Sequence, residues 1–94
     1  MADVSIYSTL ATSILQGQLA MIGPLAINQA KAVEGISIDE VNRVSIKGNG
    51  KDVLGDLVKQ FERLFGNASI EACKDAVKEA SVTISDKDLP DILK

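Results

Sequence analysis

Histidine and tryptophan are both absent from this sequence of 94 residues, and these absences exclude whole classes of function. Histidine is the residue most used for proton transfer near neutral pH and the commonest metal ligand, so no catalytic triad and no ordinary zinc site can form. Aromatic residues make up only 3% of the chain, which disfavours base stacking, and the net charge of −3 opposes binding to a phosphate backbone. We therefore expect no enzymatic activity, no metal or cofactor, and no nucleic-acid partner.

Cysteine occurs once, at Cys73, so the chain has no internal disulfide. No basic segment followed by an apolar run and a small-residue cleavage site opens the sequence, and we expect a cytoplasmic protein. Cys73 lies in an apolar stripe with Ile70 and Val77, and no histidine is present to activate it. We therefore interpret Cys73 as a buried core residue rather than a nucleophile.

Charge is nearly missing from the first 30 residues, where Asp3 is the only charged side chain. The run from Val4 to Ala30 is long enough to cross a bilayer as a helix. However, nine Ser, Thr, Asn and Gln residues interrupt it, and no Trp or Lys/Arg cluster anchors both of its ends. The sequence therefore disfavours a membrane span and predicts a segment that is buried against protein.

Apolar residues in this run recur at helical spacing and form a wide face. We expect the first helix to end at Gly23 and a second to begin at Pro24. The opposite face carries small uncharged side chains where a surface helix normally carries charge. Two explanations stay open: the helix is wrapped by the rest of the chain, or it forms a homodimer interface. The predicted interface residues are Ile6, Leu10, Ser13, Ile14, Gln16, Gly17, Ala20 and Met21.

Beyond Gly35 the period of the apolar residues changes from helical to alternating, which predicts a β-hairpin, and helical spacing then returns. The predicted fold class is α+β, predominantly helical, with four main helices, a short C-terminal helix and a small antiparallel sheet. The strands are expected at 36–39, 43–47 and 81–85, and the later helices at about 53–65, 70–80 and 89–93.

The two halves of the chain resemble each other at an offset of 43 residues. The alignment places Gly23 on Gly66, Ile14 on Leu57 and Met21 on Leu64. We interpret residues 1–94 as a single domain and raise the hypothesis that it duplicates an αα-β unit, as 1–47 and 48–94. A shorter echo, VSIKGNGKDVLGDLVK beside VTISDKDLPDILK, leaves open whether the natural chain continues beyond Lys94.

The segment KGNGKD, between a predicted strand and a predicted helix, is the feature closest to a ligand site. Glycines and a helix N-terminus present backbone N–H groups to anions. The P-loop pattern fails, however, because it requires Gly at position 45 and Ser or Thr at position 52, where Ser45 and Asp52 stand. A tight turn that ends in a helix cap is the structural alternative. An anion or small-molecule site here would comprise Gly48, Asn49, Gly50 and Lys51.

The leading functional hypothesis is a small non-enzymatic module for self-association or protein–protein interaction, which uses the uncharged N-terminal helix as core or interface. A homodimer or another protein is the expected partner. The alternatives are a small-molecule or anion-binding domain at residues 48–51 and a peripheral membrane protein. The membrane alternative is disfavoured, because interfacial helices normally carry Lys or Arg on their polar face.

Overall fold

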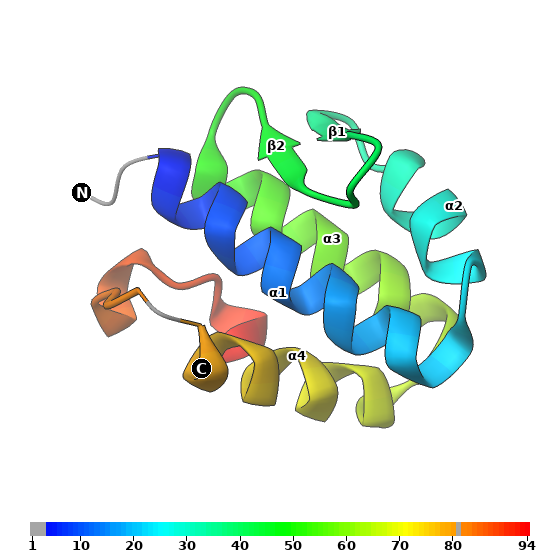
Figure 1. The fold of residues 1–94 in the computed structure, drawn as a ribbon. Coiled ribbons are helices and arrows are strands. Elements are labelled where there is room, and N and C mark those ends of the chain that lie inside the picture. Colours follow the sequence, from blue (N-terminus) through cyan, green and yellow to red (C-terminus); the bar gives the residue numbers. More distant parts are fainter. Residues whose placement is uncertain (1–3, 81) are drawn as a thin grey trace.

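The long helix α1 (Val4–Ile22) lies at the centre of the molecule, and the rest of the chain packs around it (Figure 1). The computed structural model describes residues 4–80 and 82–94. Four elements contact α1 on its different sides. They are α2 (Leu25–Lys31), β2 (Val44–Ile46), α3 (Gly50–Phe65) and α4 (Asn67–Glu79). The fold is α+β and predominantly helical with a small antiparallel sheet, as the sequence predicts.

The predicted hairpin is confirmed. β1 (Ile36–Ile38) pairs with β2 in antiparallel register, with Ile36 opposite Ile46. The turn between the strands is closed by the Asp39 carboxylate, which accepts the backbone N–H groups of Val41 (3.0 Å) and Arg43 (2.9 Å). The apolar side chains of β2 face inward and the polar one faces outward, which is the alternation that predicted the strand.

The strand predicted at 81–85 is wrong for the residues that the structure describes. Residues 82–85 pair with no strand, and Ser81 lies outside the described residues. The outer edge of β2, where a further strand could pair, is instead hydrogen-bonded to α1. Ser8 Oγ accepts the N–H of Ile46 (3.0 Å), and Thr12 Oγ1 accepts the N–H of Val44 (2.9 Å).

The C-terminal helix predicted at 89–93 is reduced to a single 3₁₀ turn at Asp91–Leu93, preceded by a similar turn at Asp86–Asp88. Leu89 and Pro90 have extended backbones, with ψ of 141° and 143°, so no helix can include them. The segment is nevertheless attached to the molecule, because Leu89, Pro90 and Leu93 are buried.

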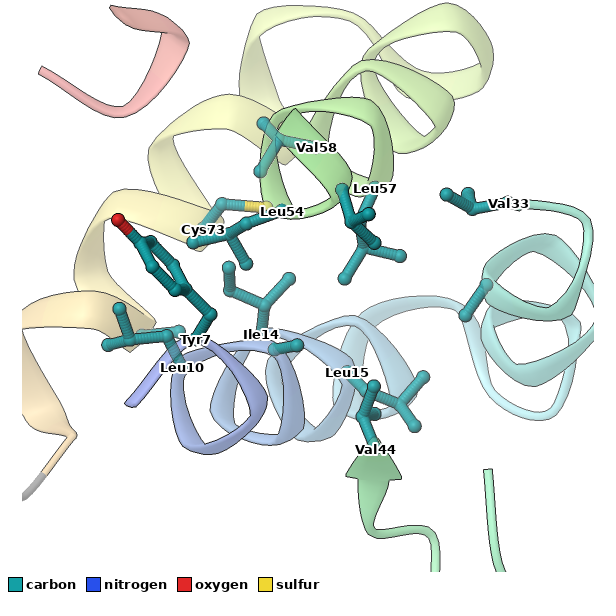
Figure 2. Packing of buried hydrophobic residues seen from close by; sticks show 14 of the residues in the cluster. Tyr7, Leu10, Ile14, Leu15, Val33, Val44, Leu54, Leu57, Val58 and Cys73 are labelled. Carbon is teal, nitrogen blue, oxygen red and sulfur yellow. The ribbon is translucent and has the colours of Figure 1, made fainter. Parts of the chain in front are cut away.

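α1 and α3 supply most of the largest fully buried side chains of the core, which is built mainly of aliphatic groups. Figure 2 shows Ile14 of α1 pointing toward Leu54 and Leu57 of α3, while Val44 of β2 lies beside Leu15. Each such side chain, when fully buried, contributes about 1.5–3 kcal/mol to stability. With so few aromatic residues available, the close packing of these aliphatic groups provides most of the burial.

Two glycine turns end the two long helices at the same end of the molecule. α1 ends at Gly23 (φ 69°) and α3 at Gly66 (φ 68°), in the left-handed region that favours glycine. α1 and α3 run in the same direction, so both turns lie at one end (Figure 1). The predicted helix boundaries at these glycines are confirmed, and the internal duplication stays a prediction.

Candidate functional site

Four polar side chains of α1 contact the backbone of β2 or α4, whereas Thr9, Gln16 and Ala20 on the uncharged face stay exposed. Besides the two hydroxyls that bind β2, Ser13 Oγ donates to the carbonyl oxygen of Ala76 in α4 (2.8 Å). Gln18 is fully buried, and its Nε2 donates to the carbonyl oxygen of Ser69 (3.4 Å). Short uncharged side chains suit these contacts because a charged one would lose its hydration against α4 or β2 without a counter-charge.

The structure divides the eight predicted interface residues into three groups. Leu10 and Ile14 are 0% and 1% exposed inside their own chain, so no partner can contact them while the chain is folded. Ile6, Ser13 and Gly17 are partly buried, and the last two lie against α4. The exposed members are Gln16, Ala20 and Met21.

Met21 belongs to an apolar surface that sequence reasoning did not find. At the end of the molecule where α1 and α3 stop and α2 begins, four large apolar side chains are between 36% and 49% exposed. They are Met21, Leu25, Leu64 and Phe65, and we call them the helix-end surface.

The geometry of α1 and α3 explains why these residues gather. At the opposite end of the molecule, Gly50 at the start of α3 lies against the ring of Tyr7 in α1. The two parallel helices then run on for the same number of residues, to Ile22 and Phe65, so their last turns reach the same level.

No charged residue occurs in 20–25 or in 64–68, the segments that hold the helix-end surface, and the exposed Arg63 in the last turn of α3 directly precedes Leu64. Elsewhere among the described residues, two other large apolar side chains are exposed, and neither lies at this end. Val4 is at the start of α1, and Val41 is in the hairpin turn. The helix-end surface is therefore a local concentration of apolar side chains rather than a sample of a generally apolar exterior.

The four residues predicted to bind an anion do line one cavity. Gly48, Asn49, Gly50 and Lys51 border a space of about 370 Å³ together with other residues that include Tyr7 and Lys87. The structure thus brings the predicted residues together and adds both a second lysine and the acidic residue Asp88 to the lining.

Each of these four residues also has a structural role, as the alternative interpretation predicts. The side chain of Asn49 accepts the N–H of Asp52 (3.0 Å) and caps α3. A Cβ at position 50 would overlap the Tyr7 ring, and Gly48 has a φ of 96°. Lys51 Nζ donates to the carbonyl oxygen of Lys87 (3.0 Å). Anion binding here stays a prediction, which an amide NMR titration with inorganic phosphate can test.

Tyr7 joins this turn to the C-terminal segment. Its hydroxyl donates to the carbonyl oxygen of Asp88 (2.7 Å). Burial, and then the nearby Asp88 carboxylate, raise the pKa of Tyr7 above its ordinary value of 10.0. The phenol therefore remains a protonated donor at neutral pH.

Cys73 is buried, as predicted, among polar groups that the sequence did not reveal. Burial raises the pKa of its thiol from 9.0 to about 11, although a hydrogen bond from Gln18 acts in the opposite direction. The thiol is therefore protonated at neutral pH and is a poor nucleophile. Within the described residues, Gln18 Oε1 and Ser69 Oγ are buried without a hydrogen-bond partner.

Over the described ranges, no three His, Cys, Asp or Glu side chains are grouped so that they could hold a metal ion. In the same part of the chain, no helix has the length and apolarity needed to cross a membrane. Comparisons with protein-family models, curated proteins and solved structures find no match to this chain. A functional inference therefore depends on the surfaces and cavities described above.

Proposed function

We propose that this protein is a small non-enzymatic self-association module, and that two copies meet through the helix-end surface. The supporting observation is the exposure of four large apolar side chains from three helices at one end of the molecule. Apolar surface removed from water contributes about 25 cal/mol per Å², and clustered exposed apolar groups mark interaction sites.

The charge distribution favours a second copy as the partner. Each chain carries a net charge of −3, so two copies repel each other wherever charged surfaces approach. The helix-end surface is free of charge and apolar, and such a surface is complementary to itself. A twofold axis brings the same surface of both copies together. We expect this association to occur in the cytoplasm, since the single cysteine indicates no need for an oxidising compartment.

Sedimentation velocity over a wide range of protein concentrations tests the proposal with the variant Leu25→Glu. We expect the wild type to form dimers and the variant to remain monomeric, because association would bury an unpaired carboxylate. Leu25 is half exposed and is the first residue of α2. Glutamate is favoured in the first turn of a helix, so the substitution should leave the fold intact, as circular dichroism can verify.

Val41→Glu is the matched control, because it introduces the same charge at a residue that is 70% exposed in the hairpin turn. This variant should associate like the wild type. A wild type that stays monomeric at every concentration would contradict the proposal. Loss of association in both variants would also contradict it. The added negative charge alone would then explain the loss, and no specific surface would be needed.

A further inference from the structure

Met21 is an exposed thioether within the helix-end surface. Its side chain is 49% exposed in the last turn of α1 and is not part of the packed core. The other sulfur-bearing side chain in the described residues, Cys73, is fully buried, and its thiol is protonated at neutral pH. An oxidant in solution therefore reaches the sulfur of Met21 and not that of Cys73.

We infer that Met21 is a peroxide-sensitive modification site that controls the self-association of this protein; the inference rests on the function proposed above. In the reaction, the thioether sulfur attacks one peroxide oxygen, the O–O bond breaks and an S–O bond forms. The sulfur loses two electrons, and hydrogen peroxide is reduced to water. The product is methionine sulfoxide, which methionine sulfoxide reductases convert back to methionine.

The sulfoxide changes the character of the surface around Met21. A flexible apolar side chain becomes polar and acquires a strong hydrogen-bond acceptor. Its neighbours in the helix-end surface, Leu25, Leu64 and Phe65, have no side-chain donor to satisfy that acceptor. Association would therefore bury an unpaired polar group on each copy, which opposes dimer formation.

The folded monomer should tolerate the same modification. Met21 lies outside the core and the partly buried side chains that pack against it, and its exposed side allows the sulfoxide to remain hydrated. Oxidation of Met21 is therefore expected to separate the copies without unfolding them.

The test compares sedimentation of the reduced wild type, the wild type treated with hydrogen peroxide, and Met21→Leu treated in the same way. Peptide mass mapping confirms the addition of one oxygen atom at Met21. We expect oxidation to weaken wild-type association by about tenfold or more, with unchanged circular dichroism, and methionine sulfoxide reductase to restore it. Met21→Leu should associate like the reduced wild type and should be insensitive to peroxide.

Met1 is present in both proteins, so the comparison separates oxidation at Met21 from oxidation at Met1. Unchanged association of protein that is fully oxidised at Met21 would overturn the inference. So would an equal loss of association in Met21→Leu, because another residue would then be responsible. If oxidation of Met21 leaves the dimer unchanged, only the inference about Met21 is contradicted. If the reduced wild type never dimerises, both the proposed function and this inference are contradicted.

Discussion

Glycine allows two ring-bearing residues to approach α3 closely. Gly50 lies against the ring of Tyr7, and a Cβ at Gly55 would come within 3.3 Å of Pro90. Both rings belong to contacts that join the C-terminal segment to the helices, since the Tyr7 hydroxyl binds the backbone of Asp88. The absence of a side chain at these two glycines therefore allows the rings to pack directly against α3. Glycine inside a helix otherwise lowers stability by about 1 kcal/mol relative to alanine.

At Cys73, the raised thiol pKa predicts a pH dependence of stability. The folded pKa of about 11 lies above the ordinary value of 9.0, so the folded state holds the proton more tightly than the unfolded state does. The corresponding stability is fully present below pH 9 and is lost as the pH rises from 9 to about 11. By pH 10 the loss should amount to roughly 1 kcal/mol.

Urea denaturation of the wild type and Cys73→Ala, with a reducing agent present, measures this loss. The alanine variant is expected to be less stable at pH 8 because it leaves a small cavity. The difference between the two proteins should then shrink toward pH 10, since Tyr7 titrates in both and cancels. A difference that stays constant across this range would show that Cys73 does not titrate as a buried thiol.

Among the elements, the contact between α1 and β2 explains the uncharged hydroxyl residues Ser8 and Thr12. The Thr12 hydroxyl donates to the carbonyl oxygen of Ser8 (2.9 Å) and accepts the N–H of Val44 (2.9 Å). Val44 is fully buried, so its N–H has no access to water. The Ser8 hydroxyl likewise accepts the N–H of Ile46. Hydroxyl groups of a helix thus accept hydrogen bonds from the backbone N–H groups at the edge of β2, where a third strand would otherwise pair.

We predict that Thr12→Val lowers the free energy of unfolding by about 1–3 kcal/mol, because it leaves the buried N–H of Val44 without a partner. Valine keeps the shape of threonine, so packing is little changed. Thr9→Val is the control: Thr9 also donates to a carbonyl four residues earlier, but it is exposed. Urea denaturation should show little loss for Thr9→Val. Equal losses in the two variants would mean that the Val44 contact contributes nothing.

Local periodicity predicted most of the fold because helices and hairpins depend on residues that are close in sequence. The four helices, the hairpin and the glycine turns were all expected. The role of the α1 polar face was not decided, since the partners of Thr12 and Ser13 lie 32 and 63 residues away. The third strand was wrong for the same reason: alternation along 81–85 carries no information about what covers β2.

The helix-end surface was found only in part. Met21 was predicted to contact a partner, whereas Leu25, Leu64 and Phe65 were missed because they belong to other helices. A signal was available, since the 43-residue offset aligns Met21 with Leu64 and places glycine after both helices. The alignment places Met21 and Leu64 at the same end of the molecule only if the two helices run parallel. Periodicity alone does not reveal the relative direction of two helices.

At the scale of the whole molecule, a single copy of the chain buries the apolar face of α1, whereas Thr9, Gln16 and Ala20 on the uncharged face stay exposed. Leu10, Ala11, Ile14 and Leu15 are fully buried without any partner chain. The monomer should therefore be a stable folded state, and self-association should add to that stability rather than create it. An interface helix would behave differently, because separating the copies would expose it and destabilise the fold.

Native-state hydrogen exchange of the Leu25→Glu monomer tests this claim most directly. We predict that the amides of Leu10 to Leu15 in α1 exchange only through global unfolding and are among the slowest in the protein, together with those of Leu54 to Val58 in α3. Rapid exchange along α1 while α3 stays protected would contradict the account, because α1 would then depend on a partner for its burial.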